Sequence, residues 1–194
     1  MVMARSKRAR QARPTRQELV SARHRTLPDV IAPGLKVLLC GINPSLYSAA
    51  MGQHFARPGN RFWPALYRAG ITERQLAPKE QRELLSIGYG VSNIVARATA
   101  QAAELDDGEL QAGIVVLERK VRRFRPGLVA FLGVTAYRAA FGKPRATLGL
   151  QQERLAEAPL WVLPNPSGLN AHHQLDDLAR LMRQLHQHVS GDSQ

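Results

Sequence analysis

The sequence predicts an α/β fold: a three-layer α/β/α sandwich in which helices cover both faces of a short, mainly parallel central sheet. Two observations support this fold class. Short apolar runs of strand length alternate along the chain with segments whose apolar residues recur at helical spacing. Three of the four expected strands are almost continuously apolar, which is typical of parallel strands that are buried on both faces.

In the first half of the chain, proline positions help to delimit the expected elements. Pro64 fits only the first turn of a helix, and Pro78 divides the segment in which it lies into two short helices. The elements are, in order, a buried strand (35–42), a long loop (43–59), a helix (60–71), this pair of short helices (72–88) and a second strand (89–95).

In the second half, helix signals at both ends of the expected helices guide the assignment. The longest helix ends in a basic turn before Pro126-Gly127, and we expect Thr135 to cap the next helix, which ends at Gly142. The elements are, in order, a helix (107–125), a third strand (128–134), a short helix (135–142), an irregular segment (143–158), a fourth strand (160–165) and a C-terminal helix (173–189).

The composition is that of a strongly basic protein with one domain. Its 194 residues carry a formal net charge of +12, and the expected partner of such a protein is a polyanion. Cys40 is the single cysteine, which excludes an internal disulfide and a four-cysteine zinc site. No apolar run approaches the length of a membrane span, and we expect no membrane attachment, no metal and no cofactor.

Much of the positive charge lies at the N-terminus. The first 25 residues hold eight Arg and Lys residues against Glu18 alone. We expect residues 1–28 to form a basic and mostly disordered arm, with a short helix after Thr15, and residues 29–190 to form the domain. An Arg-rich N-terminus also suits an organelle presequence, although serine is scarce here. For a bacterial protein we expect a cytoplasmic location, in association with the nucleoid.

The same turn follows two different strands. Asn43-Pro44-Ser45 comes directly after the first strand, and Asn165-Pro166-Ser167 begins where the fourth strand ends. Asn-Pro is a common turn opener, so either motif alone is explained by capping of a turn or helix. In a parallel sheet, however, both motifs lie at one edge and can form two walls of a cleft, with Ser92 and Asn93 as a third.

The two motif loops offer amides, hydroxyls, backbone N–H groups and aromatic rings, and they contain no carboxylate. The sequence also lacks the glycine-rich phosphate loops, the Gly-x-Ser-x-Gly nucleophile turn and the His-Glu-x-x-His zinc motif. An amide is not a strong general base, but it can orient a water molecule. The expected cleft therefore suits a planar, amide-like ring as its ligand.

The chain closely resembles the mismatch-specific uracil/thymine DNA glycosylases of the uracil-DNA glycosylase superfamily in two stretches, "GINPSLYSAAMGQHFARPGNRFWPALYRAGITERQL" and "NPSGLN". The resemblance spans residues 31–189. It implies a monofunctional DNA N-glycosylase that flips uracil out of duplex DNA and hydrolyses its N-glycosidic bond, leaving an abasic site for base excision repair. The implied partner is double-stranded DNA that carries a U·G mispair or a related lesion, and the implied state is a monomer.

The resemblance also implies roles for residues of the cleft. Asn43 matches the catalytic asparagine that positions the attacking water, and Phe55 matches the aromatic ring that stacks on the flipped base. The backbone at Ile42 and Phe55 matches the groups that read the edge of uracil. Asn165 stands where other branches of the superfamily carry a histidine. The expected base pocket consists of the following residues: Ile42, Ser48, Phe55, Asn93 and Asn165.

A second group of residues is expected to contact the duplex. Gly168 and Leu169 match the wedge that fills the space left by the flipped base, and an apolar wedge is a known device for holding DNA open. Arg57 and Arg61 are expected to contact phosphates.

Two departures from the family pattern bear on specificity. Family members can carry arginine two residues beyond the wedge leucine, where it meets the orphaned guanine, but this chain has Ala171 there. Recognition of the opposite base then falls to Asn170, His172 or backbone groups. Asn93 occupies a strand position at which a carboxylate could act as a base. An amide cannot do so, and Asn93 can therefore only orient a ligand.

Two other hypotheses stay open from the sequence. One is a nucleic-acid-binding domain without activity, and the other is an enzyme that acts on free nucleotides or nucleosides. Retention of both Asn-Pro-Ser motifs and of Phe55 argues against the first, while the basic charge and the wedge disfavour the second. The sequence leaves open whether thymine, ethenocytosine or hypoxanthine is also removed, and whether U·A pairs or single-stranded DNA are substrates.

Overall fold

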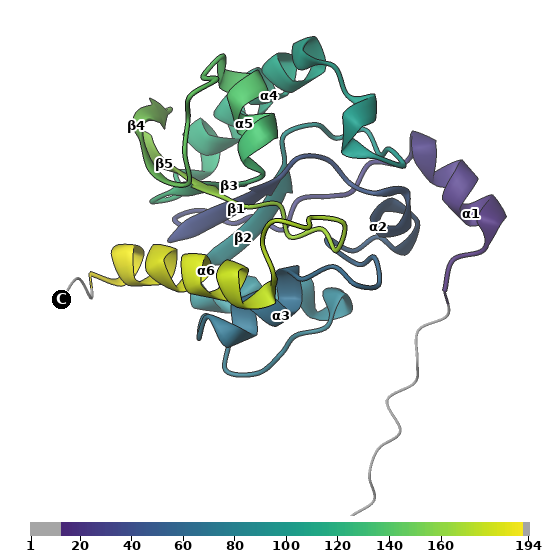
Figure 1. Cartoon of the computed structure of the whole chain (residues 1–194), viewed down its shortest axis with the longest axis horizontal. Coiled ribbons are helices and arrows are strands. Elements are labelled where there is room, and N and C mark those ends of the chain that lie inside the picture. Colours follow the sequence, from purple (N-terminus) through teal and green to yellow (C-terminus); the bar gives the residue numbers. More distant parts are fainter. Residues whose placement is uncertain (1–12, 192–194) are drawn as a thin grey trace, which may run out of the picture.

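A five-stranded sheet crosses the middle of the protein in the computed structural model, which describes residues 13–191 (Figure 1). The strand order is β2-β1-β3-β5-β4. Four strands are mutually parallel, and β4 runs antiparallel to β5 at one edge. The strands are β1 Val37–Gly41, β2 Tyr89–Asn93, β3 Val129–Leu132, β4 Gly149–Leu155 and β5 Ala158–Leu163.

Helices cover both faces of this sheet, which confirms the three-layer α/β/α prediction. In Figure 1, α4 and α5 lie on one face, and α3 and α6 lie on the other. The α-helices are α1 Arg16–Ser21, α2 Leu46–Met51, α3 Phe62–Arg68, α4 Asp107–Phe124, α5 Val134–Phe141 and α6 Leu175–Ser190. Shorter 3₁₀ helices are η1 Ala22–His24, η2 Pro78–Ile87 and η3 Ala102–Glu104.

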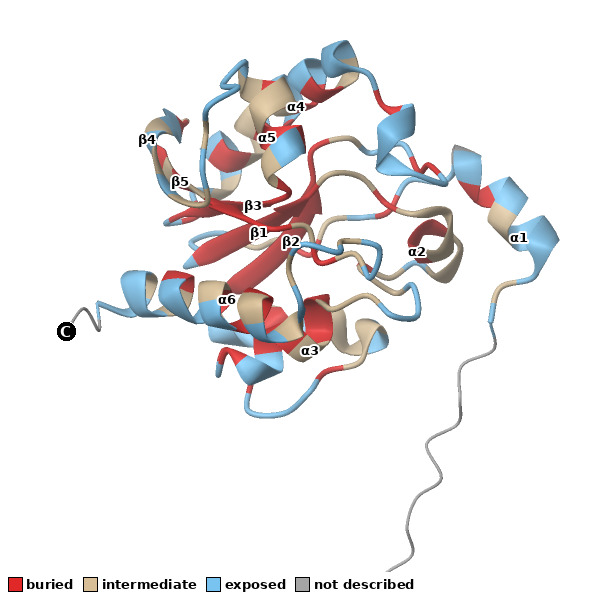
Figure 2. Cartoon of the chain, viewed as in Figure 1, coloured by how far each residue is buried: buried red, intermediate tan, exposed pale blue. Residues whose placement is uncertain are grey.

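Two cores, one on each face of the sheet, explain the continuous apolar runs of the strands. Neighbouring residues of a strand point to opposite faces. In β1, Leu39 packs in the core that contains Phe62 of α3, and Leu38 packs in the core that contains Leu117 of α4 and Tyr137 of α5. β1, β2 and β3 are therefore buried along their whole length (Figure 2).

Two elements lie where the sequence predicted none. The expected loop 43–59 contains α2, because the Ser45 hydroxyl accepts a hydrogen bond from the Ser48 backbone N–H and caps a single helical stretch. The expected irregular segment 143–158 contains β4, which pairs with β5 across a tight turn at Ala156 and Glu157. Both turn residues have positive φ, at 46° and 73°, without the glycine or asparagine that normally marks such a turn.

Two local predictions were also wrong. The segment before Pro78 forms bends and irregular chain, and only the part that begins at Pro78 becomes helical, as η2. Thr135 does not cap α5, since that helix begins one residue earlier, at Val134, with Gly133 as its N-cap. Gly133 has a φ of 142°, a conformation that favours glycine, and this lets the chain turn sharply out of β3.

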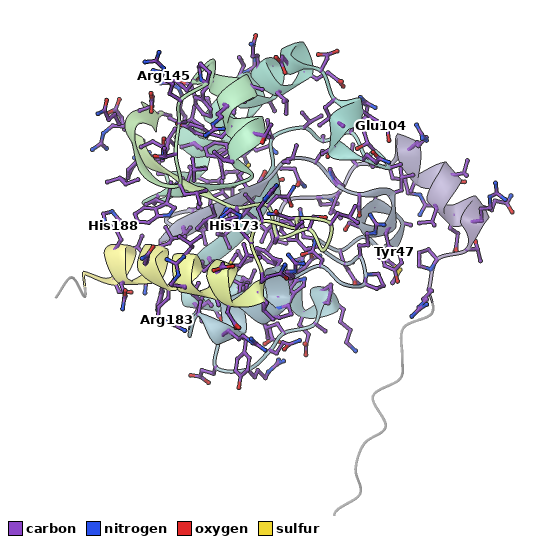
Figure 3. All side chains as sticks on the ribbon, in the orientation of Figure 1. Tyr47, Glu104, Arg145, His173, Arg183 and His188 are labelled. Carbon is purple, nitrogen blue, oxygen red and sulfur yellow. The ribbon has the colours of Figure 1, made fainter. Side chains whose placement is uncertain are left out.

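Part of the predicted arm packs against the domain. The predicted helix after Thr15 is present as α1, and Thr15 and Glu18 form a capping box. Ala22 is fully buried against Ala49 and Ala98. The Arg23 guanidinium lies 3.5 Å from Glu104, which is labelled beside α1 in Figure 3. The packed structure thus begins before residue 29, and the rest of the predicted arm, residues 1–12, lies outside the described residues.

No helix in the described part of the chain is both long enough and apolar enough to cross a membrane.

Candidate active site

A cleft of about 680 Å³ opens at the carboxyl ends of the parallel strands. The chain reverses its direction of winding between β1 and β3, because β2 lies on one side of β1 and all later strands lie on the other. Ligands of open α/β sheets bind at such a switch point. Asn43 after β1, Asn93 at the end of β2, Gly133 after β3 and Asn165 after β5 all line this cleft, as the sequence predicted for the two Asn-Pro-Ser motifs.

The orientation of the Asn43 amide is determined by its two partners. Asn43 Nδ2 lies 2.8 Å from the Arg97 carbonyl oxygen, which can only accept, and 2.7 Å from Thr99 Oγ1. The Thr99 hydroxyl donates its own hydrogen to the Gln101 carbonyl at 2.8 Å, so toward Asn43 it acts as an acceptor. Because both partners are acceptors, the amide atom that faces them is the nitrogen. Asn43 Oδ1 then remains an acceptor for a ligand or water.

Phe55 is held in an unusual backbone conformation with its ring against the core. Its φ is +53°, which is uncommon for a bulky residue and often occurs at functional sites. The ring stacks on Phe62 at a centroid distance of 4.0 Å and an interplanar angle of 24°. Gly41 leaves room for this ring and for the Asn93 amide, since a Cβ there would lie 2.6 Å from Asn93 Oδ1 and 3.2 Å from the Phe55 ring. One ring face is thus backed by the core, and the residue lines the cleft.

His54 and Asn93 form a chain of hydrogen bonds at the base of the cleft. His54 Nε2 lies 3.0 Å from the Pro28 carbonyl and must carry the hydrogen of that bond. Burial lowers the pKa of the imidazole below its ordinary value of 6.5, and the neutral ring then offers Nδ1 as an acceptor. Asn93 Nδ2 lies 3.5 Å from Nδ1 and donates to it, so Asn93 Oδ1 is left as an acceptor in the cleft.

Ser48 lies in the cleft and also supports the turn that carries Phe55. Its oxygen accepts hydrogen bonds from the Ala56 backbone N–H and the Ser45 hydroxyl, both at 3.1 Å. A hydroxyl has one hydrogen and two lone pairs, so Ser48 can offer its own O–H to a ligand. Ile42 lines the cleft beside it. Tyr47 of α2 does not line the cleft, and Figure 3 shows it on the side of the molecule near α1.

Asn165 faces the cleft with its nitrogen available for donation. Its Oδ1 accepts a hydrogen bond of 2.9 Å from the Ser167 backbone N–H, which stabilises the turn after β5. The planar amide therefore has Nδ2 left as a donor. Asn43 and Asn165, which occupy the same place in two copies of one motif, offer opposite groups: an acceptor at Asn43 and a donor at Asn165.

Leu169 lies at the rim of the cleft on a loop that we call the wedge loop, residues 165–173. This residue is 75% exposed, the highest value among the large apolar residues that the structure describes as exposed. Gly168 is required by packing, since a Cβ at this position would lie 2.6 Å from the Gly59 carbonyl oxygen. An exposed leucine on a closely packed turn is consistent with the predicted wedge.

The four polar residues predicted to contact DNA have different surroundings. Arg57 is exposed at the rim of the cleft, and His172 is exposed on the wedge loop. The Arg61 guanidinium donates hydrogen bonds to three backbone carbonyls of that loop. This differs from the prediction that Arg61 contacts a phosphate. Both ends of the Asn170 amide bond to the loop itself, to Asn165 and His172, so this side chain supports the loop and does not project from it.

Two residues of the site, His54 and Thr99, were not predicted from the sequence. His54 precedes Phe55 directly, but its role depends on Pro28 and Asn93, which are distant in the sequence. Thr99 lies 56 residues after Asn43 in a segment without a recognisable motif. Ser92, predicted as part of the third wall, is buried behind the cleft, where its hydroxyl donates to Asp29 at 2.7 Å.

Within residues 13–191, no group of three or more His, Cys, Asp or Glu side chains comes together in a way that could hold a metal ion.

Two comparisons with known proteins identify the family and the fold. The sequence profile described as the Uracil DNA glycosylase superfamily matches residues 28–186. Among solved structures, the protein is similar to the solution NMR structure of a candidate uracil DNA glycosylase from Methanosarcina acetivorans. The TM-score is 0.56 and the sequence identity 20%, over 84% of this chain and 98% of that one. At this identity the structural similarity supports the shared fold only, and membership of the family is shown by the profile match.

Proposed function

This chain belongs to the uracil DNA glycosylase superfamily, and on that premise we propose that it releases uracil from duplex DNA by hydrolysing the N-glycosidic bond. The observation that carries the proposal is the orientation of Asn43. Two hydrogen bonds from its Nδ2, to the Arg97 carbonyl and to Thr99, leave Oδ1 as an acceptor in the cleft that Phe55 lines. An acceptor at this place can hold a water molecule beside the sugar of a flipped nucleotide.

The base pocket has the donors and acceptors that uracil requires. Uracil stacks on the exposed face of Phe55, and its N3–H donates to Asn93 Oδ1. Cytosine has an acceptor at N3, so this contact discriminates between the two bases. The uracil carbonyl oxygens accept hydrogen bonds from the Ser48 hydroxyl and Asn165 Nδ2. Because these groups are fixed before the substrate binds, they can stabilise negative charge as it develops on the leaving base.

The reaction consumes one water molecule. The bond between C1′ and N1 breaks, uracil leaves as an anion, and the water held by Asn43 Oδ1 adds its oxygen to C1′. The proton that this water loses balances the charge on uracil, and an abasic sugar remains. Asn43 can hold water but cannot form a covalent bond to the sugar, so we propose a monofunctional enzyme. General-base catalysis typically contributes about 10²–10⁴-fold, and an amide forgoes much of it, which predicts slow turnover.

We further propose that the enzyme prefers uracil mispaired with guanine and acts in base excision repair, as the mismatch-specific branch of the superfamily does. Flipping costs least at a mismatched pair, so a slow enzyme gains selectivity from the flipping step itself. Leu169 then enters the space vacated by the base. We propose that the protein acts as a monomer on the chromosome, in the cytoplasm if the organism is bacterial.

Contacts to the DNA backbone are expected around the cleft. Arg57 is exposed at its rim, and Gly133, Val134 and Thr135 at the start of α5 also line it. The N-terminus of a helix carries partial positive charge, which favours a phosphate nearby. These groups position the duplex and do not read its sequence.

A base-release panel tests the proposal. The protein is incubated in excess with duplexes that contain U·G, U·A or T·G and with single-stranded DNA that contains uracil, and abasic sites are cleaved with alkali. We expect release from U·G to be fastest, followed by U·A. Binding without release from any of these substrates would identify a non-catalytic DNA-binding domain. Release from free deoxyuridine but not from DNA would identify a nucleoside enzyme.

A further inference from the structure

Arg61 makes an unusual set of hydrogen bonds to the wedge loop. Its Nη1 donates to the carbonyl oxygens of Asn170 at 2.8 Å and His173 at 2.7 Å, and its Nη2 donates to that of Gly168 at 3.3 Å. Its backbone N–H donates to the Pro166 carbonyl at 2.9 Å. One residue, at the start of α3, therefore holds four carbonyl groups of a loop that begins more than 100 positions later.

These contacts surround the wedge residue. Leu169 lies between Gly168 and Asn170, whose carbonyls Arg61 holds on both sides. Gly168 also packs so closely on Gly59 that a Cβ would not fit. Leu169, which has the highest exposure among the large apolar residues described as exposed, thus projects from a backbone that is fixed at several points. Figure 3 shows His173, the last residue of this loop, in the middle of the molecule just before α6.

The chemistry of arginine suits this arrangement. Its planar guanidinium presents several donors in a rigid fork, whereas lysine presents a single flexible ammonium. The guanidinium fork of Arg61 is occupied by three backbone carbonyls of the wedge loop. Arg57, four residues earlier, is exposed at the rim of the cleft, where a phosphate of bound DNA could reach it.

We propose that Arg61 is a positioning residue for uracil excision, which holds the wedge loop in the conformation that inserts Leu169 into DNA. This inference rests on the proposed function. A loop that is ordered during folding does not have to be ordered again each time a base is flipped, so preorganisation favours the flipped state. Arg61 acts through Leu169 and need not touch the DNA. Its charge is then less important than its geometry.

The test compares Arg61→Gln, Arg61→Lys, Leu169→Ala and the double variant Arg61→Gln/Leu169→Ala. Base flipping is followed by stopped-flow fluorescence of 2-aminopurine placed beside the uracil, and uracil release by single-turnover assays on U·A and U·G duplexes. Misplacement of a positioned group by about 1 Å can cost up to about 10²-fold, and we expect Arg61→Gln to slow release from U·A by about 10- to 100-fold. The flipping signal should fall in parallel.

Three further results are expected if Arg61 acts through Leu169. The double variant should be no more than about twofold slower than Leu169→Ala, because the two residues act as one unit. Arg61→Lys should not restore the rate. The slope of log affinity against log salt should stay unchanged in Arg61→Gln but flatten by about 0.9 in Arg57→Gln, as loss of one phosphate contact predicts.

Arg138→Gln is the matched control for folding. Arg138 also uses its guanidinium to hold a backbone carbonyl, that of Ala146, at 2.9 and 2.7 Å, and it is not among the residues that line the cleft. This variant should keep the flipping signal of the wild type. A duplex in which uracil faces an abasic site provides a second control, because its uracil is already unpaired. Arg61→Gln should lose less activity on it than on U·A.

Several outcomes would overturn the inference. Full rescue by lysine together with a flatter salt slope in Arg61→Gln would make Arg61 a phosphate contact. Additive losses in the double variant would separate Arg61 from Leu169. An equal loss on the pre-opened duplex and on U·A would indicate general structural damage. Failure of the wild type to release uracil from any duplex would instead refute the proposed function, and the 2-aminopurine signal would still report on Arg61.

Discussion

At Asn43, the surrounding backbone decides what an amide side chain can offer to a substrate. The Arg97 carbonyl and the Thr99 hydroxyl both take hydrogen bonds from Nδ2, so the amide cannot rotate by half a turn without losing both. The identity of Asn43 could be predicted from its motif, but the direction of its oxygen could not. That direction depends on contacts across more than 50 positions of the chain.

Thr99 should therefore control the rate without touching the substrate. We predict that Thr99→Val, which keeps the shape of the side chain but removes the hydroxyl, slows single-turnover uracil release about tenfold, as expected for a misplaced catalytic group. Thr99→Ser keeps the acceptor and should stay close to the wild-type rate. The assay uses a U·G duplex, and thermal melting checks that both variants fold. Equal rates for the two variants would contradict an orienting role of the hydroxyl.

His54 should make stability depend on pH in the acid range. Its folded pKa lies below the ordinary 6.5 because burial disfavours the charged imidazole. Above pH 6.5 the ring is neutral in the folded and unfolded states alike. As the pH falls below 6.5, the unfolded chain binds a proton that the folded protein does not, so stability is lost until the folded pKa is passed.

We therefore predict that the wild type melts at a higher temperature than His54→Gln, and that this difference becomes smaller as the pH falls from about 7.5 to about 5.5. Glutamine cannot titrate but can still donate to the Pro28 carbonyl. Other titrating groups are common to both proteins and cancel in the difference. A margin that stays constant over this range would show that His54 does not resist protonation.

Among the elements, those that belong to the sheet and its covering helices could be predicted from the sequence, because their burial imposes a regular pattern. β1 and α4 are examples: one is a continuous apolar run, and the other repeats its apolar residues at helical spacing. α2 and β4 could not be predicted in the same way. α2 is six residues long, and β4 is set by pairing with β5 around Ala156 and Glu157, which carry no local turn signal.

The wedge loop should matter most where the base pair is hardest to open. We predict that Leu169→Ala slows uracil release more at U·A than at U·G, because the stable pair depends more strongly on intercalation to keep the base extrahelical. Single-turnover rates on the two duplexes give the ratio directly. If the losses are equal, or if there is no loss, Leu169 is an ordinary loop residue despite its exposure of 75%.

For the molecule as a whole, α1, the first helix that the structure describes, lies on the same side as the cleft. α1 packs beside α2, and α2 begins directly after the Asn43-Pro44-Ser45 turn (Figure 1). We therefore expect the segment that precedes residue 13 to contact DNA. It contains Arg5, Lys7, Arg8 and Arg10 and no acidic residue.

Deleting residues 1–12 should weaken DNA binding without affecting the chemical step. If about half of the four basic residues meet phosphates, the slope of log affinity against log salt should flatten by about two units. This deletion leaves the buried Ala22 in place, so the fold is kept. Fluorescence anisotropy on one duplex at several salt concentrations measures both slopes. A single shared slope would make the segment a targeting or solubilising tail.

The role of Asn43 in holding the attacking water is tested by comparing uracil release by the wild type and Asn43→Ala from a U·G duplex under single-turnover conditions. We predict that Asn43→Ala is slower by at least about 10²-fold, the scale of one positioned catalytic group. Binding to a duplex with an abasic site should be nearly unchanged, because Asn43 holds water and not the DNA. Release at close to the wild-type rate by Asn43→Ala would show that Asn43 does not hold the attacking water.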